Sequence, residues 1–209
     1  MFSAAVIIMF GMTASMTQCS ENAGFADTAD PDEEVLKQTG QDPLSDQEIK
    51  GILFMREEEK LARDVYLDLY EVYPLRPFLN ISKSEQAHMD AVLYLIEVYG
   101  LEDPVGENPR GVFQNEGLQQ MYKELIQAGS ATREEALKVG ALIEEVDILD
   151  LQHELENNVT NDDVRRVFAN LCRASEYHLR AFVRVLRFYG VEYEPVKLSM
   201  EEFTRIMEQ

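Results

Sequence analysis

Residues 77–99 read PFLNISKSEQAHMDAVLYLIEVY. Pro77 suits the first turn of a helix, and Gly100 follows the last residue as a helix stop. At about 100° per residue, the apolar side chains share one face of this helix: Ile81, Val92, Leu95, Ile96 and Tyr99. Glu85 and His88 lie in the middle of that face, one turn apart. We therefore expect a carboxylate and an imidazole inside the core.

Capping residues mark the beginnings of the other helices. Four positions begin the motif of a side-chain cap: Ser45, Thr132, Thr160 and Ser199. They predict four long helices, near 46–73, 77–99, 132–157 and 162–189. A turn-rich loop and a short helix (116–127) cross over between the second and third, and a short helix closes the chain. No segment alternates with the period of a strand, so the predicted fold class is all-α, a four-helix bundle.

Ionisable groups recur in the apolar stripes of the other long helices. Glu144 lies at the centre of the stripe of the third helix, and Ser175 and His178 lie within that of the fourth. In the first helix the centre falls between Glu58 and Glu59, so the periodicity leaves both open.

A buried carboxylate without a partner costs several kcal/mol and neutralises unless it is paired or binds a metal. No Lys or Arg occupies an inward position beside these groups. A metal cluster would be a common partner for all four helices. Carboxylate oxygen with imidazole nitrogen, without thiolate, suits iron or manganese better than structural zinc.

Each residue taken singly has a simpler interpretation. Glu85 could close a capping box with Ser82, although Pro77 starts the helix too early for that. His88 or His178 alone would more often be a hydrogen-bonded core histidine than a ligand. Their agreement in phase is what favours a shared site.

Three other features have structural interpretations. We expect residues 56–60 (REEEK) to be mostly a solvated face, whichever acid turns inward. His153 lies off its stripe and is predicted to be a surface histidine. Cys172 is predicted to be a small buried hydrophobe rather than a ligand.

The amino-acid composition excludes some classes of binding partner and of metal site. Thirty-nine acids against 19 bases give a net charge of −20, which disfavours nucleic acid and favours metal cations or a basic partner. Two cysteines, Cys19 and Cys172, are too few for a disulfide framework, a four-cysteine zinc site or a rubredoxin-type iron centre.

The N-terminal 19 residues, MFSAAVIIMFGMTASMTQC, have the length and apolar core of a signal peptide, and Cys19 resembles the acylated cysteine of bacterial lipoproteins. No base precedes the apolar run, and residues 16–18 match a cleavage box poorly. We expect a leader (1–19), an acidic flexible linker (20–44) and a helical domain (45–209). This predicts a location in the cell envelope, periplasmic or anchored at Cys19, with the cytoplasm as the alternative.

The motifs Glu59-x-x-Ala62-x-x-x-Tyr66 and Glu85-x-x-His88, with Glu144 and His178, resemble the ferritin-like di-iron carboxylate superfamily of rubrerythrin and bacterioferritin. The strings EEEKLARDVY, ISKSEQAHMD, EEVDILDL and HLRAF are more closely similar to an uncharacterised ferritin-like family of bacteria and archaea. The resemblance covers roughly residues 45–190. It implies a ferritin-like bundle and favours Glu59 over Glu58.

One position departs from the superfamily, which has Glu where this chain has Ser175. Asp147, one turn after Glu144, could replace that carboxylate, and rubrerythrin-like members carry a second acid at this spacing. The predicted metal ligands are then Glu59, Glu85, His88, Glu144, Asp147 and His178. Four carboxylates would balance two divalent ions. Without Asp147 the site is expected to hold one ion, or two with an exposed, labile coordination position.

The resemblance implies two iron ions, with manganese as an alternative, and ferroxidase, peroxidase or oxygen-activating chemistry. Electrons would come from ferrous iron or from an external donor, because the chain has no rubredoxin motif. The alternative is a non-enzymatic helical module of the cell envelope with a structural or degenerate metal site. The sequence leaves the oligomeric state open.

Overall fold

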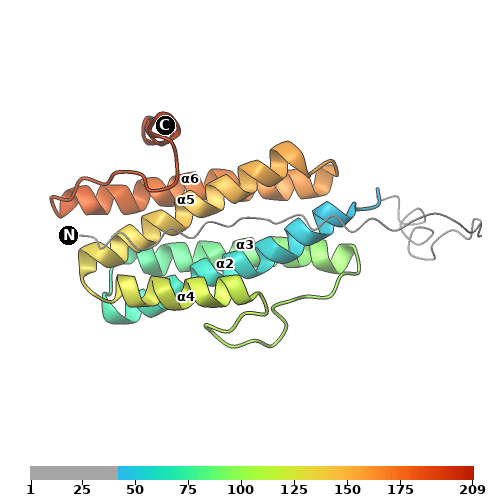
Figure 1. Cartoon of the computed structure of the whole chain (residues 1–209), viewed down its shortest axis with the longest axis horizontal. Helices are drawn as coiled ribbons and strands as arrows, with labels where there is room; N and C mark the ends of the chain where they lie inside the picture. The colour runs from blue at the N-terminus through green and yellow to red at the C-terminus, as the bar shows by residue number, and fades with distance from the viewer. Residues whose placement is uncertain (1–41) are drawn as a thin grey trace, which may run out of the picture.

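The computed structural model describes residues 42–209, which form six α-helices (Figure 1). The helices are α2 (Asp46–Val72), α3 (Arg76–Val98), α4 (Glu116–Gly129), α5 (Arg133–Asn157), α6 (Asp162–Phe188) and α7 (Met200–Met207). No strand occurs in this part of the chain, so the predicted all-α class is confirmed. The predicted leader with Cys19, and most of the predicted linker, lie outside the described residues. Among residues 42–209, no helix is both long and apolar enough to cross a membrane.

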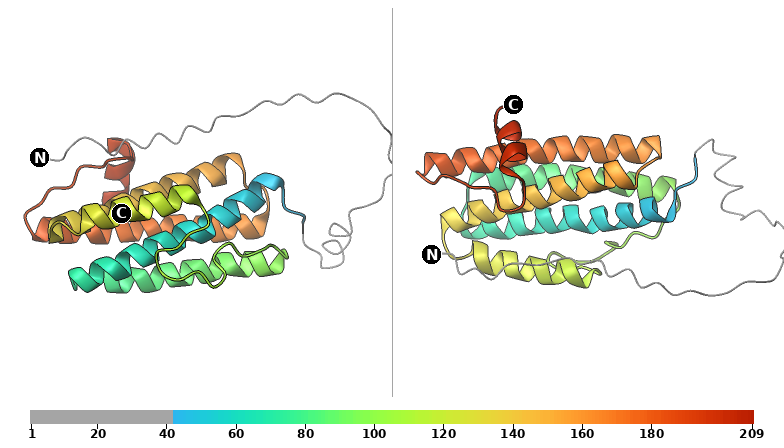
Figure 2. Two further views of the ribbon diagram at one scale, coloured as in Figure 1. Left: turned by 60° about the horizontal axis from the view of Figure 1, so that its bottom comes forward. Right: turned by 45° about the horizontal axis from the view of Figure 1, so that its top comes forward.

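The four long helices form two pairs, α2 with α3 and α5 with α6, which lie against each other (Figure 1). Contacts between α3 and α6, and between α2 and α5, join the pairs, as the sequence predicts for its second and fourth long helices. The predicted crossover is also present: the chain leaves α3, passes through a long loop and α4, and returns as α5. Helix α4 packs against α2 and α5, and α7 crosses the bundle steeply beside α6 (Figure 2).

The beginnings of α2 and α6 are tied together by one carboxylate. Ser45 and Glu48 form the predicted capping box of α2. Glu48 also accepts hydrogen bonds from the backbone N–H groups of Thr160 and Asn161 (2.8 and 2.7 Å). Although burial favours the neutral acid, these bonds lower its pKa to about 2. The prediction that Thr160 caps α6 is wrong: Asn161 is the cap, because Thr160 is engaged by Glu48.

Apolar side chains fill the bundle on both sides of its middle, toward its two ends. One cluster contains the ring triad Tyr66, Phe78 and Phe182, with centroids 5.3–6.2 Å apart. The other contains Phe168 and residues of α2, α3 and α5 near the opposite end. The polar residues predicted to bind metal lie between these clusters, so their position along the bundle is set by apolar packing on both sides.

The expectation of a solvated face at residues 56–60 is wrong, because all five side chains are buried. The loop before α4 covers this part of α2 and supplies partners for Arg56, Glu57 and Lys60. Arg56 pairs with Asp103, Glu57 accepts from two backbone N–H groups of the loop, and Lys60 pairs with Asp64 and donates to Pro109 O. Burial of these charges is tolerated because nearly every one meets an opposite charge or a hydrogen-bond donor.

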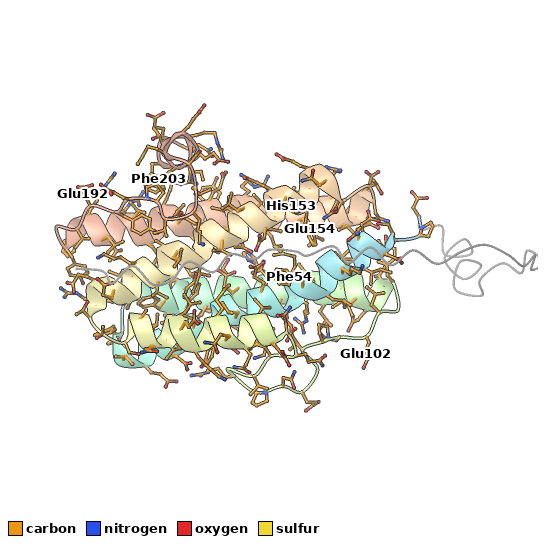
Figure 3. All side chains as sticks on the ribbon, viewed as in Figure 1. Phe54, Glu102, His153, Glu154, Glu192 and Phe203 are labelled. Atoms are coloured by element: carbon orange, nitrogen blue, oxygen red, sulfur yellow. The ribbon has the colours of Figure 1, made fainter. Side chains whose placement is uncertain are left out.

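The C-terminal segment is held by Glu145 on α5. Its carboxylate accepts hydrogen bonds from the Tyr193 hydroxyl (2.5 Å) and from the backbone N–H groups of residues 196, 197 and 198. Phe203 and Ile206 of α7 are buried and belong to the same apolar cluster as residues of the long helices. Figure 3 labels Phe203. The predicted capping box of α7, Ser199 with Glu202, is present.

Candidate metal centre

Two buried groups of carboxylates and histidines meet at the middle of the bundle. In the first group, the possible ligand atoms of Glu59, Glu85 and His88 lie within 4.8 Å of one another. Nδ1 of His88 lies 2.7 Å from Oε2 of Glu85 and 3.1 Å from Oε2 of Glu59. Helix α3 supplies two of these side chains because residues three apart share one helix face. Helix α2, which packs against α3, supplies the third side chain, Glu59.

The second group consists of Glu85, Glu144 and His178, again within 4.8 Å. Nδ1 of His178 lies 2.9 Å from Oε1 of Glu85 and 3.4 Å from Oε2 of Glu144. Glu85 therefore belongs to both groups, with one carboxylate oxygen facing each. A carboxylate shared in this way has the geometry to bridge two ions.

The two histidine rings are oriented by one serine. They stack with centroids 5.5 Å apart, and both turn Nε2 toward the hydroxyl of Ser84 on α3. The distances are 3.5 Å for His88 and 3.1 Å for His178. Both Nδ1 atoms consequently face the carboxylates, so each ring offers the same nitrogen to the centre.

Four buried ligand atoms at the centre have no hydrogen-bond partner among the described residues: Oε1 of Glu59, Oε1 of Glu85, Oδ1 of Asp147 and Nδ1 of His178. The Glu85 and His178 atoms are 2.9 Å apart but not aligned for a hydrogen bond. Unpaired buried polar atoms are costly, and cations bound at the two groups would give such atoms partners. Within residues 42–209, the only ion-pair partners of Glu59, Glu85 and Glu144 are the two histidines.

Asp147 lies beside the two groups but is not part of either. Its side chain is buried, and its Oδ2 accepts a hydrogen bond from the hydroxyl of Ser175. Its other oxygen is one of the unpaired atoms. Asp147 on α5 and Ser175 on α6 are thus direct neighbours at the centre.

The metal-free centre is organised by ion pairs. Burial alone would lower the pKa of both histidines, but Glu59 and Glu85 raise that of His88 to about 11. Glu144 and Glu85 likewise raise that of His178 to about 10. Burial opposes ionisation of Glu85, yet its close contacts with His178 and His88 lower its pKa to about 2. The two protonated histidines therefore supply the positive charge that a bound metal would otherwise supply to these carboxylates.

The remaining carboxyl groups at the centre are pushed toward the neutral form. Burial, followed by the charge of Asp147, raises the pKa of Glu59 well above its usual range. Burial also raises the pKa of Glu144, and it raises that of Asp147 to about 7, against the hydrogen bond from Ser175. Like charges crowded in a dry core cannot all ionise without added positive charge.

The structure brings five of the six predicted ligands together and places Asp147 next to them. Glu59, rather than Glu58, faces His88, while Glu58 faces Asp150 on α5, whose charge adds to burial in raising the pKa of Glu58. His153 is exposed on α5, as predicted (Figure 3).

Two further residues contact the centre: Tyr66, which the sequence analysis named in a motif without a role, and Ser84, which it missed. The hydroxyl of buried Tyr66 donates to Oε1 of Glu144 at 2.6 Å, and Ser84 orients the histidines. Ser84 stands four residues before His88, so it lies one turn away on the same side of α3. That spacing was the available signal, but a serine at a helix position carries little information without its partner across the bundle.

Comparison with known proteins gives one family. Residues 48–209 match the model of the uncharacterized protein domain DUF2202. The chain is 47% identical over 174 residues to the uncharacterized protein MJ0754 of Methanocaldococcus jannaschii, covering 83% of this chain and 94% of that protein. It also matches the crystal structure of hypothetical protein MJ0754 from Methanococcus jannaschii with a TM-score of 0.79, covering 81% of this chain and 96% of the other. The chain therefore belongs to the DUF2202 family.

Proposed function

We propose that the helical domain is a ferritin-like domain that binds two divalent metal ions, preferably iron, between α2, α3, α5 and α6. One ion would be held by Glu59, Glu85 and His88, and the other by Glu85, Glu144 and His178. The observation that carries the proposal is the sharing of buried Glu85 between two carboxylate–histidine groups. Carboxylate oxygen and imidazole nitrogen are ligands that iron and manganese accept.

Charge balance supports two ions rather than one. With Asp147, the centre contains four carboxyl groups, and two divalent cations would neutralise them. The two protons on the histidines would have to leave, because a ligating imidazole nitrogen must be free of its proton. Asp147 has an unpaired oxygen that could complete the coordination of either ion.

We further propose an oxidoreductase role of the ferroxidase or peroxidase type. An iron pair, when bound, supplies two electrons at one place, which is the number that reduction of one hydrogen peroxide to water requires. The protein residues have supporting tasks. The two apolar clusters exclude water from both sides, Ser84 fixes the imidazole rings, and Tyr66 holds Glu144 through its hydroxyl.

A second candidate is a helical interaction module whose metal site is structural. Ser175 favours it, because a serine in place of a carboxylate removes one ligand that the superfamily uses. The two candidates differ in one property. A structural ion would bind without changing its oxidation state when peroxide is added, whereas the iron of a peroxidase-type centre would become ferric.

The test is the metal content of the full chain, purified without chelator and then reconstituted anaerobically with Fe(II). We expect about two ions per chain, as in dinuclear bundles. Glu85→Gln should lose both ions, because Glu85 contacts both groups and an amide is a poor metal ligand. Glu97→Gln, an exposed position on the same helix, is the matched control and should keep both.

Peroxide added to the loaded protein should produce the near-ultraviolet absorbance of ferric iron. Bound iron that stays ferrous would support the structural candidate and contradict the oxidoreductase role. Wild-type protein that takes up neither Fe(II) nor Mn(II), while circular dichroism shows it folded, would refute the metal site itself.

A further inference from the structure

Helix α6 reverses the charge of the molecule locally. Residues 164–191 contain one acidic residue, Glu176, in a chain that otherwise has many more acids than bases. They also contain six arginines: Arg165, Arg166, Arg173, Arg180, Arg184 and Arg187. Arg205 on α7 pairs with Glu176 at 2.8 Å, so even that negative charge is neutralised. A concentration of positive charge on an acidic protein calls for a reason other than solubility.

Three of these arginines surround a hollow between α6 and α7. The hollow has a volume of about 110 Å³ and is lined by Arg180, Val183, Arg184, Arg187 and Met207. The arginines are four and three residues apart, so they project from the same side of α6. Val183 is buried beneath them, and Met207 closes the hollow from α7, so the floor is apolar while the rim is positive.

The guanidinium groups at the rim are only partly used by the protein. Arg180 is fixed, because it donates to Ile206 O at 3.0 Å and stacks 4.3 Å above the ring of Tyr177. Arg187 has only a contact at 3.5 Å to Glu192, with both side chains more than half exposed. Arg184 is exposed and has no hydrogen bond or ion pair within residues 42–209.

We propose that this hollow binds a phosphate group, either free inorganic phosphate or the headgroup of an anionic lipid. Guanidinium groups present paired N–H donors that match the oxygens of phosphate. Three of them around one small volume suit a compact tetrahedral anion with several oxygens better than a carboxylate with two. The acidity of the rest of the molecule disfavours a long polyanion such as nucleic acid.

The surroundings also suit a lipid headgroup. Phe188 and Tyr177 are 83% and 60% exposed and belong to the same helix as the arginines. Aromatic and arginine side chains side by side are typical of surfaces that meet the headgroup region of a bilayer. The phosphate chemistry is common to both sources, so the experiment must separate them.

The test compares the full chain with two variants, all carrying Cys19→Ser so that no acyl chain contributes. Arg184→Gln/Arg187→Gln removes two guanidinium groups at the rim that do not support the fold. The double variant Arg166→Gln/Arg173→Gln makes the same change in charge nearer the beginning of α6. At about 1.5 Å per residue, this pair lies roughly 20 Å from Arg184 and Arg187. Calorimetry measures binding of inorganic phosphate, and sedimentation measures binding to phosphatidylcholine vesicles with and without phosphatidylglycerol.

We expect binding in at least one arm, weakened about tenfold or more by Arg184→Gln/Arg187→Gln and much less by the control, because charged hydrogen bonds are lost only at the hollow. Phosphate binding without vesicle binding identifies the free anion as the ligand. Binding to vesicles only when they contain phosphatidylglycerol identifies the lipid headgroup. No binding in either arm, or equal loss in the two double variants, would overturn the proposal.

Discussion

Glu57, Glu58 and Glu59 follow one another on α2 and face three different partners. Glu57 accepts hydrogen bonds from the loop before α4, Glu58 faces Asp150 on α5, and Glu59 contacts His88 on α3. Successive residues of a helix point about 100° apart, so three neighbouring acids reach three different elements. Identical side chains therefore have different consequences when they are replaced.

Replacing Glu59 should affect metal binding more than stability. Burial and Asp147 raise the pKa of Glu59, while His88 lowers it. Gln has the same shape without the charge, so the lost pair with His88 is offset by the relief of burial and of repulsion from Asp147. We expect Glu59→Gln to lose at least one metal ion per chain while the free energy of unfolding of the apo protein stays within about 0.5 kcal/mol of wild type. Metal analysis and urea denaturation measure the two effects.

Glu57→Gln should lower the stability of the protein and leave its metal binding unchanged. Glu57 accepts from the backbone N–H groups of Gln114 and Asn115 at 2.5 and 3.0 Å, one with each oxygen. An amide nitrogen in place of one oxygen would face an N–H donor. We expect a loss of about 1–3 kcal/mol in unfolding free energy with metal content unchanged. If both variants behave alike, the separate tasks described for these neighbours are wrong.

The histidines make the apo protein sensitive to alkaline pH. Their pKa values of about 11 and 10 lie above the ordinary 6.5, so their contribution to stability is fully present below pH 6.5 and is lost as the pH rises through 10 and 11. Asp147, at about 7 instead of 3.8, acts in the same direction. We expect urea denaturation of apo protein to show an unfolding free energy that falls steadily from pH 6.5 to pH 10.

Metal-loaded protein is the comparison for that experiment. Its histidines would already be unprotonated as ligands, so raising the pH should cost it much less stability. On the acid side, Glu85 stabilises above pH 4.5 and loses this effect as the pH falls through 2. An apo protein whose stability does not change between pH 6.5 and 10 would show that the imidazolium–carboxylate pairs do not form.

At the scale of elements, α5 and α6 approach closely because Gly140 has no side chain. A Cβ at this position would lie 2.5 Å from the ring of Phe182, which is fully buried and forms part of the ring triad below the centre. The ring cannot move without disturbing Tyr66, which holds Glu144. The glycine thus contributes to the position of Glu144, which lies about one turn further along α5.

We expect Gly140→Ala to destabilise the protein by about 1–3 kcal/mol through overpacking, despite the better helix propensity of Ala. Chemical denaturation measures this. The double variant Gly140→Ala/Phe182→Leu provides the control, because a smaller side chain makes room for the added methyl group. It should be more stable than the sum of the two single changes predicts; strict additivity would mean that the steric contact is not the cause.

At the scale of the whole molecule, charge is distributed unevenly. The chain has a net charge of −20, and yet α6 presents arginines on its exposed side. Asp42, the first described residue, lies at the end of the bundle where α2 and α6 begin, since Asn161 donates to Asp42 O there.

The lipoprotein hypothesis makes a prediction about location. Cys19→Ala should shift the protein from the membrane fraction to the soluble fraction of its host, because the thioether-linked acyl chains would be missing. The helical domain should remain folded by circular dichroism. Cys172→Ala is the matched control: this half-buried residue packs beside the core, so its loss should not change the distribution. The same distribution for both variants would rule the anchor out.

The sequence by itself was sufficient to predict where the helices begin and end and which side chains of the candidate site face the core. The four long helices begin and end within one residue or so of their expected positions, because caps, prolines and apolar periodicity act within a few residues along the chain. The same periodicity placed Glu85, His88, Glu144 and His178 on inward faces, where the structure has them. Both kinds of information are local.

Only the tertiary structure decided which residues of 56–60 are paired and with what. The partners of Arg56 and Glu57 stand about 30 to 60 residues away, in α3 and in the loop before α4. Lys60 pairs locally with Asp64 but also donates to Pro109 O of that loop, and no local pattern predicts that the loop folds back over α2. The choice of Glu59 over Glu58 as the neighbour of His88 has the same origin. It depends on the rotation of α2 about its axis, and that rotation is set by packing against α3 and α5 rather than by the residues of α2 alone.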